Sequence, residues 1–416
     1  MREMKDSGIK WIGAIPNHWR VSKIKQIVRW KSVKGQPDLP VLSLYRDYGV
    51  IPKDSRDDNH NVTSLDTSGY KVVEHGDLVI NKMKAWQGSL AVSEYNGIVS
   101  PAYHICKITS ENICKKYLHY LLRDASYLPE YMRLSTGLRV GQWDLSFDDF
   151  KNIPFLVPPL AEQERIAAFL DAECAEIDAV LEKTRASIEE YKKLKQAVIT
   201  QAVTKGIHSD RPMKDSGIEW IGEIPAEWGV VPHKRIMHKV KEICEQYNGE
   251  DIISLTVNGV VKRDLTAGGK MPTSFDGYQY VEPNDLLLCL FDIDVTPRCV
   301  GVVRDYGVTS PAYSRFVMHD GYYNAYYDYL LRMIDDNKVF VHLSKNLRSS
   351  LTESDFGAIK TCAPPLAEQK CIAAFLDVRC DEIDALIAKK QQYLTEIENY
   401  KKSLIYEYVT GKKEVV

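Results

Sequence analysis

Apolar residues recur at alternating steps of four and three positions along two stretches of this 416-residue sequence. One stretch begins at Leu170 and the other at Leu376, and both keep the same register over many turns. A stripe that advances by seven residues in every two steps is the seam of a coiled coil. The seam positions are Leu170, Ile177, Leu181, Ile188, Leu376, Ile383, Ile387 and Leu394. The pattern therefore predicts two long amphipathic helices, each able to cover the apolar stripe of the other.

Proline and glycine mark the two ends of each predicted helix. Residues 158–159 and 364–365 are Pro-Pro, which suits the approach to a first helical turn but not a helix interior. Gly206 and Gly411 are plausible stops, because glycine readily takes the left-handed conformation that ends many helices. About 43 residues at about 1.5 Å each make a rod on the order of 65 Å long. A rod of that length is a spacer.

The whole chain repeats itself once. PPLAEQERIAAFLDAECAEIDA at 158–179 returns as PPLAEQKCIAAFLDVRCDEIDA at 364–385, and MKDSGIKWIGAIPNHW at 4–19 returns as MKDSGIEWIGEIPAEW at 213–228. Self-similarity at a fixed offset indicates tandem structural units. We therefore predict two half-molecules, each a globular domain and a long helix, in a two-fold arrangement that lays the helices antiparallel. The predicted boundaries are 1–157 and 209–363 for the globular domains, and 158–208 and 364–416 for the helices.

The globular segments carry a different pattern. Short strand-like runs broken by glycines lie around 41–45, 77–83, 90–94 and 98–108. Residues 115–134 have the spacing of a helix, and residues 209–363 repeat the whole plan with different content. The predicted fold class is two α/β (α+β) globular domains in pseudo-two-fold tandem repeat, separated by a pair of long antiparallel coiled-coil helices.

Positive charge is concentrated locally. The formal net charge is only −3, whereas a nucleic-acid-binding protein is often basic overall. Two acid-free stretches, 20–34 and 232–241, supply candidate phosphate-binding cations: Lys23, Lys25, Arg29, Lys31 and Lys34, and Lys234, Arg235, Lys239 and Lys241. In the first stretch, the apolar positions Val21, Ile24 and Ile27 suit the buried face of a helix. A solvated helix face without a ligand is the other interpretation, because charge runs often have no further role.

Two loops of each globular domain carry side chains that suit reading base edges. Asn and Gln can pair bidentately with adenine, and Arg and Lys with guanine. The candidates are Lys82, Lys84, Trp86, Gln87, Arg139 and Gln142 in the first domain, and Arg298, Lys345, Asn346 and Arg348 in the second. For Trp86 and Trp143, packing at the rim of the domain is an equally good explanation. A shared frame with different loops is what two readers of different targets would show.

Other chemistries find little support in the sequence. Asp292 and Asp294 have no third carboxylate or histidine near them, so a metal site is disfavoured, and the chain has no dinucleotide fingerprint, zinc-ligand spacing or nucleophile elbow. Nothing argues for catalysis. The sequence shows neither a signal peptide nor an apolar run long enough to span a membrane, and its nine cysteines lack a CxxC pair. We therefore expect a soluble, cytoplasmic protein.

Taken together, these motifs resemble the specificity subunit of a type I restriction-modification system over essentially the whole chain. The resemblance implies that each globular part is a target recognition domain for one half of a split double-stranded DNA site. It implies that the paired helices set the separation of the domains and dock two methyltransferase subunits, and that a restriction subunit with translocase and nuclease activity joins them. No cofactor is expected on this chain; S-adenosylmethionine, ATP and Mg are expected on the partner subunits. Base-reading loops differ between family members, so no individual contact can be transferred.

Two alternatives stay open at this point. One is a scaffold that does not bind DNA, whose coiled coil separates two protein-binding modules. The other is the specificity part of a related restriction system that uses a different partner. The first alternative predicts no salt-sensitive affinity for DNA, which distinguishes it from the other two interpretations.

Overall fold

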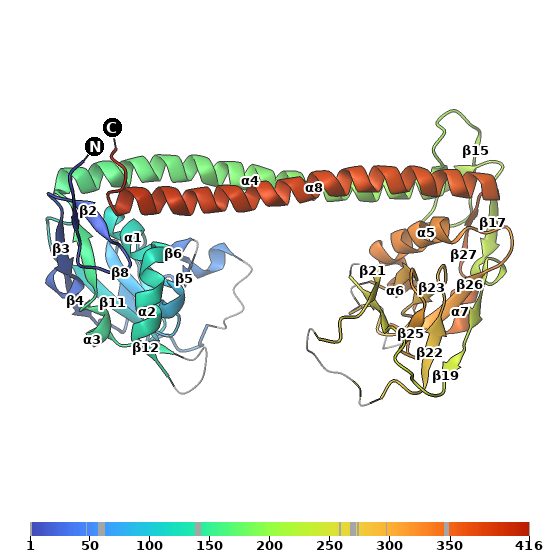
Figure 1. Cartoon of the computed structure of the whole chain (residues 1–416), viewed down its shortest axis with the longest axis horizontal. Helices are drawn as coiled ribbons and strands as arrows, with labels where there is room; N and C mark the ends of the chain where they lie inside the picture. Colours follow the sequence, from blue (N-terminus) through green and yellow to red (C-terminus); the bar gives the residue numbers. More distant parts are fainter. Residues whose placement is uncertain are drawn as a thin grey trace. The chain divides into compact units, whose positions relative to one another are not determined.

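The computed structural model describes residues 2–46, 48–56, 63–137, 143–257, 259–266, 272, 274–296, 298–344 and 349–415. The chain forms two compact units. Unit 1 is Met1–Arg185 with Gln392–Val416, and unit 2 is Ala186–Gln391. The division runs through the two long helices, α4 (Leu160–Lys205) and α8 (Leu366–Val409), so each unit holds one half of each helix (Figure 1).

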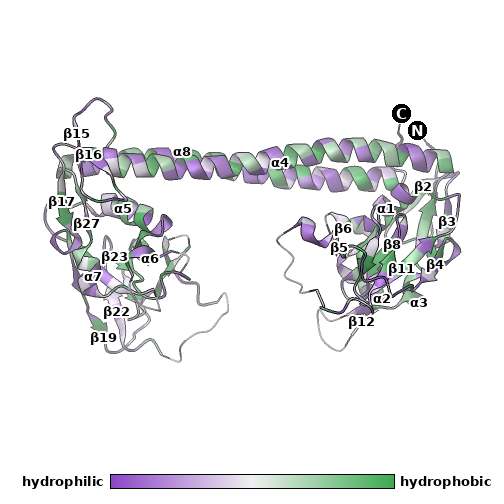
Figure 2. Ribbon diagram, turned by 180° about the vertical axis from the view of Figure 1, so that it is seen from behind, coloured by the Kyte–Doolittle hydropathy of each residue, from purple (hydrophilic) through white to green (hydrophobic). Residues whose placement is uncertain are grey.

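Unit 1 is built around a four-stranded antiparallel sheet of order β4-β11-β8-β9. Its strands are β4 (Val28–Lys31), β11 (Tyr103–Ile108), β8 (Asp77–Asn81) and β9 (Leu90–Val92). Because side chains alternate along a strand, each strand feeds two cores. Leu78 and Ile80 belong to the larger core under the helices, whereas Val79 belongs to a smaller one shared with Leu42 and Val99. The strands of both units are mostly apolar, whereas α4 and α8 alternate between polar and apolar positions (Figure 2).

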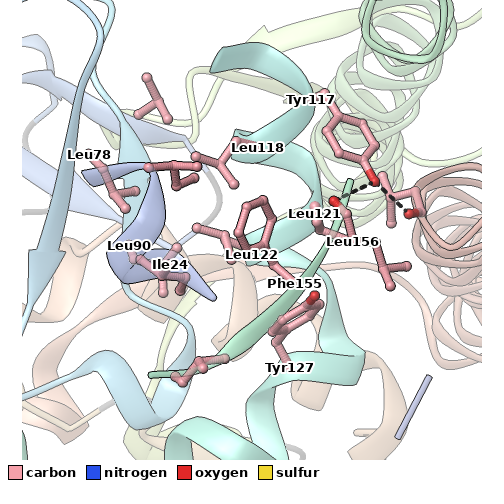
Figure 3. Close-up of a cluster of buried hydrophobic side chains, with 14 of the residues drawn as sticks. Ile24, Leu78, Leu90, Tyr117, Leu118, Leu121, Leu122, Tyr127, Phe155 and Leu156 are labelled. Carbon is pink, nitrogen blue, oxygen red and sulfur yellow. Dashed lines mark hydrogen bonds between the residues drawn. The ribbon is translucent and has the colours of Figure 1, made fainter. Parts of the chain in front are cut away.

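The remaining elements of unit 1 frame these two cores. They are β1 (Met4–Asp6), β2 (Ala14–Pro16), β3 (Arg20–Lys23), η1 (Ile24–Gln26), β5 (Leu42–Tyr45), β6 (Gly49–Pro52), η2 (Lys53–Ser55), β7 (Lys71–Val73), η3 (Ala85–Gln87), β10 (Gly97–Val99), α1 (Lys115–Arg123), η4 (Ala125–Tyr127), α2 (Leu128–Leu134), β12 (Ser135–Thr136), β13 (Asp144–Leu145), α3 (Phe147–Phe150) and β14 (Pro154–Val157). Figure 3 shows the larger core, in which Leu118, Leu121 and Leu122 of α1 lie among Leu78, Leu90 and Phe155.

Two sequence predictions for unit 1 need correction. The helix expected over 20–34 is wrong, because β3 pairs with β14, β4 pairs with β11, and a single 3-10 turn joins them. Ile24 and Ile27 are buried as expected, whereas Val21 is 40% exposed. β-branched residues favour strands, and pairing with distant partners decides their conformation. The helix expected over 115–134 is broken at Asp124, whose carboxylate accepts a hydrogen bond from the Ser126 N–H at 2.9 Å and begins a new turn.

Unit 2 repeats this architecture, with a central sheet of order β18-β26-β23-β24. Its elements are β15 (Met213–Asp215), β16 (Glu223–Pro225), β17 (Gly229–Pro232), η5 (His233–Arg235), β18 (Met237–Val240), β19 (Ile243–Cys244), β20 (Ile253–Thr256), β21 (Gly259–Lys262), β22 (Tyr278–Val281), β23 (Leu286–Leu288), β24 (Val300–Val302), β25 (Gly307–Thr309), β26 (Ser314–Met318), α5 (Asn324–Asp336), α6 (Val339–Leu343), α7 (Glu353–Ala358) and β27 (Lys360–Ala363). The pairing of β17 with β27 corresponds to that of β3 with β14. Both halves therefore share one frame.

The two long helices pair antiparallel in each unit. In unit 1, Asp178 of α4 lies 2.6 Å from Lys401 of α8, and Arg185 lies 2.7 Å from Glu398, so rising numbers on one helix meet falling numbers on the other. In unit 2, the Lys195 ammonium lies 2.6 Å from the Asp384 carboxylate. Of the predicted seam positions, Leu170, Leu181, Ile188, Leu376 and Ile383 are at most 6% exposed, and Ile177, Ile387 and Leu394 are half-buried.

The repeated sequence motifs fasten each globular part to its helix. The buried indole of Trp19 donates to the Glu162 carboxylate at 3.1 Å, and that of Trp228 donates to Glu368 at 2.8 Å. Gln163 is fully buried. Its side-chain amide donates hydrogen bonds to the carbonyls of Asn112 and Pro158, and its side-chain oxygen accepts one from the Cys114 N–H. The near-identity of these motifs in the two halves thus has a structural cause, since the same joint is built twice.

In each unit, a tyrosine hydroxyl also connects the globular part to the last turn of a long helix, α8 in unit 1 and α4 in unit 2. The Tyr117 hydroxyl donates to the Val409 carbonyl at 3.1 Å and also approaches the Leu156 carbonyl at 3.4 Å (Figure 3). In unit 2, the Tyr326 hydroxyl donates to the Val203 carbonyl at 2.8 Å. These tyrosines satisfy carbonyls of the last helical turn, which have no partner within the helix.

Candidate nucleic-acid interface

The structure brings together the two loops of unit 1 that the sequence singled out. The Leu145 N–H donates to the Lys82 carbonyl at 2.9 Å, and the Lys82 ammonium lies 2.9 Å from the Asp144 carboxylate. The Trp86 and Trp143 rings meet edge to face, with centroids 5.2 Å apart. Residues more than 50 positions apart in the chain therefore form one surface, which we call the loop surface: residues 81–88 and 143–145.

Local geometry sets the shape of the Trp86 loop. The Asn81 side chain accepts from the Met83 N–H at 3.2 Å, and the Trp86 indole donates to the Met83 carbonyl at 3.1 Å. Gly88 closes the turn at φ +83°, a conformation that favours glycine. Lys84 is exposed, and the Gln87 side chain accepts a long hydrogen bond from Arg46 at 3.4 Å. The two tryptophans are half-buried against each other, as the rim-packing interpretation expects, and each keeps an exposed part.

The cations of the first basic stretch differ in their exposure to solvent and in their ion pairing. Lys23, Lys25, Arg29 and Lys34 are exposed on β3, η1, β4 and the segment that follows. Lys31 is not, because its side chain is 12% exposed and its ammonium lies 2.7 Å from Asp77 and 2.9 Å from Glu74. Burial alone would lower the pKa of Lys31, but the hydrogen bonds to these two carboxylates outweigh it and raise the pKa. The charge of Lys31 is therefore already matched within the domain.

In unit 2, Lys234, Arg235 and Lys241 are exposed, and Lys239 lies 3.5 Å from Glu353. The Arg298 guanidinium donates to the Val300 carbonyl at 2.9 Å and is half-buried; burial, followed by the nearby charge of Arg332, lowers its pKa. Among the predicted base-reading residues, Arg139, Gln142, Lys345, Asn346 and Arg348 lie outside the described residues.

Among the described residues, the structure gives no support for a metal site or a membrane-spanning helix. Across the described residues, no group of three or more His, Cys, Asp or Glu side chains could hold a metal ion, and this covers Asp292 and Asp294. In the same part of the chain, no helix is both long enough and apolar enough to cross a membrane.

Sequence reasoning missed two residues beside the loop surface. Lys71 of β7 is 9% exposed and donates to the Tyr103 carbonyl at 2.6 Å. The His104 ring donates to the Leu145 carbonyl at 3.1 Å, and burial lowers the pKa of this histidine. A comparison of the two halves strand by strand would have found Lys71, because the corresponding position of the second half holds glutamine.

Known proteins show the same organisation. Residues 16–190 match the type I restriction modification DNA specificity domain. Over 97% of its length, the chain is 24% identical to a putative type I restriction enzyme MjaX specificity subunit of Methanocaldococcus jannaschii, covering 96% of that protein. It is also 24% identical to the type I restriction enzyme MjaVIII specificity subunit of the same organism, over 96% of this chain and 94% of that one.

Solved structures share the fold. A chain from a structural study of complex assembly and conformational transition of the type I R-M system superposes with a TM-score of 0.70 at 15% identity, covering 96% of this chain and 99% of that one. The HsdS subunit from Thermoanaerobacter tengcongensis gives a TM-score of 0.51 at 14% identity, covering 98% and 100%. Mixed α/β domains separated by long helices are thus common to these proteins. Residues 16–190 thus match a type I restriction modification DNA specificity domain, and the chain as a whole is similar to type I specificity subunits.

Proposed function

We propose that this chain is the DNA-recognition subunit of a type I restriction-modification enzyme and reads a bipartite double-stranded site, one half with each globular domain. The observation that carries the proposal is the duplicated frame with unlike loops. The joints at Trp19 and Trp228 are the same, whereas the loop surface of unit 1 carries Lys82, Lys84 and Trp86 where unit 2 has residues 291–298.

The positions of the charged and amide side chains suggest two separate roles, phosphate binding and base reading. Exposed cations such as Lys23, Lys25 and Arg29 neutralise phosphates and orient the domain, while loop side chains contact base edges. The paired helices hold the two readers in register and dock two methyltransferase subunits and the restriction subunits. In this proposal the chain is not itself an enzyme; S-adenosylmethionine, ATP and Mg bind to its partners, and the complex works in the cytoplasm.

Salt dependence of binding tests whether the chain is a DNA reader or a protein scaffold. We expect the full-length chain to bind a duplex with a log affinity that falls linearly with log salt concentration, because phosphate contacts release counterions. Fluorescence anisotropy over a salt series measures this slope. A chain whose DNA affinity is negligible at low salt is a scaffold for other proteins, and the proposal then fails.

Replacing Lys23, Lys25 and Arg29 with glutamine should weaken binding about equally for all DNA sequences. It should also reduce the salt slope by as much as about three, since each phosphate contact contributes close to one. The same anisotropy titration measures both effects on a cognate and a random duplex. The matched control removes three exposed lysines from the helices, Lys183, Lys193 and Lys402. An unchanged slope in the first variant would remove the basic stretch from the interface.

A further inference from the structure

Two lysines of unit 1, Lys34 in the segment after β4 and Lys71 of β7, face each other directly. Lys34 and Lys71 form an antiparallel bridge, which places the two side chains on one face with Cβ atoms about 5 Å apart. Like charges at directly opposed positions destabilise a sheet unless something compensates them. The arrangement therefore has a cost that packing alone does not explain.

A third cation completes this group. The Lys82 N–H donates to the Ala102 carbonyl at 3.3 Å, and the next carbonyl along the chain, that of Tyr103, accepts from the Lys71 ammonium at 2.6 Å. Burial lowers the pKa of Lys71, and the positive charges of Lys34 and Lys82 lower it further. Lys82 has one carboxylate partner, Asp144 at 2.9 Å. Neither Lys34 nor Lys71 has an ion-pair partner among the described residues. The cluster therefore holds three cations against one carboxylate and carries a net positive charge.

The Lys71 ammonium also has hydrogen-bonding capacity to spare. An ammonium carries three donors, and one of them goes to the Tyr103 carbonyl at 2.6 Å. The side chain is 9% exposed, so its charge is largely removed from water, and the Trp30 ring lies 5.6 Å away. A largely desolvated cation binds an anion more strongly than a solvated one does.

The second half of the chain shows what the position requires structurally. Lys71 pairs with Val99, and Gln279 pairs with Thr309 at the corresponding place in unit 2. The Gln279 amide donates to the Tyr313 carbonyl at 2.7 Å and to the Ser310 carbonyl at 3.0 Å, so it supports the same turn that Lys71 supports. Opposite Gln279 stands Ile243 in place of Lys34. A neutral amide is thus enough for the fold, and the charge in unit 1 serves something else.

We propose that Lys34, Lys71 and Lys82 form a binding site for one phosphodiester group of the DNA backbone and anchor the first domain beside its loop surface. Lys82 belongs both to this lysine cluster and to the loop surface. In this proposal the phosphate-binding site and the base-reading loops therefore share one side chain. This inference rests on the proposed function. It assigns to unit 1 a phosphate contact that unit 2, with Ile243 and Gln279, does not make.

The test is a salt series on the full-length chain with a random-sequence duplex. Lys71→Gln copies the residue that unit 2 uses, so the fold should persist while one charge is lost. We expect affinity to fall roughly fivefold to tenfold at about 0.1 M salt and the slope to decrease by about one. Lys34→Gln, at an exposed position, should do the same. The double variant should lose less than the product of the two effects, because both residues bind one phosphate.

Two controls make the outcome decisive. Lys107→Gln removes an exposed lysine from β11 outside the cluster and should leave the slope unchanged, and Lys71→Arg should retain most of the affinity. If wild type binds in a salt-dependent manner but Lys34→Gln and Lys71→Gln match it, the cluster is only structural and the inference is overturned. If Lys71→Gln does not fold, Lys34→Gln alone decides. Failure of the wild type to bind DNA overturns the proposed function itself, which is a different result.

Discussion

Leu181→Asp should lower the free energy of unfolding by about 3 to 5 kcal/mol. Leu181 is 4% exposed in the seam between α4 and α8, so the change removes a buried leucine and places a carboxylate where it has no partner. Chemical denaturation followed by circular dichroism measures the loss. Ile387→Asp at the half-buried seam position of unit 2 should show a smaller loss in the same direction.

The neighbouring residue provides a matched control. Val180 lies one position earlier on the same helix and is 41% exposed, so Val180→Asp introduces the same carboxylate into the helix without burying it. We expect it to cost less than about 1 kcal/mol. Equal stability of the Val180 and Leu181 variants would mean that the seam does not hold the helices together.

Insertions of four helix-forming residues in both long helices, after Ala186 of α4 and after Gln391 of α8, should widen the gap between the two half-sites. Both helices have to be lengthened, because each unit is hydrogen-bonded to one end of α4 and one end of α8, and both are continuous through the boundary between the units. Four residues lengthen each helix by about 6 Å, close to two base pairs at roughly 3.4 Å each. They also add a rotation of about 40° beyond a full turn, which the intervening DNA has to absorb in part. We expect a gap larger by about one or two base pairs and unchanged half-site sequences.

Methylation mapping in cells that carry the variant and a methyltransferase subunit reads out both the gap and the half-sites. The same four residues inserted after Ser209, an exposed position following α4, are the control and should leave the gap unchanged. Some loss of stability is expected for the first variant, because four residues shift the seam out of phase. An active variant with an unaltered gap would show that these helices do not measure the distance.

The long helices could be predicted in detail because one periodic pattern fixes them. Leu170, Leu181 and Leu376 follow the heptad spacing, and no distant contact is needed to recognise it. The prediction of a helix over residues 20–34 was wrong for the opposite reason, since distant contacts decide the structure there. Ile24 and Ile27 are buried in the observed strand-turn-strand as they would be in a helix, so their spacing fits both, and pairing of β3 with β14 decides between them.

The candidate interface was predictable only in part. Composition pointed to the loop with Lys82 and Trp86. Its contacts with Trp143 and Asp144 could not be predicted, because these residues lie far away in the sequence and approach the loop only in the folded domain. Lys71 gave no signal within its own half of the chain, since a lysine in a short strand is ordinarily solvated. Its meaning comes from Lys34 across the sheet and from Gln279 at the corresponding position of unit 2.

The most direct measurement is the methylation pattern of a genome that expresses this chain with a methyltransferase subunit, compared with the same cells lacking the chain. Single-molecule sequencing detects the modified bases. Two readers on one chain predict chain-dependent methylation at a split site, with two constant half-sites separated by a gap of fixed length and variable sequence. Methylation at one uninterrupted sequence, or methylation that persists unchanged without the chain, would contradict the account.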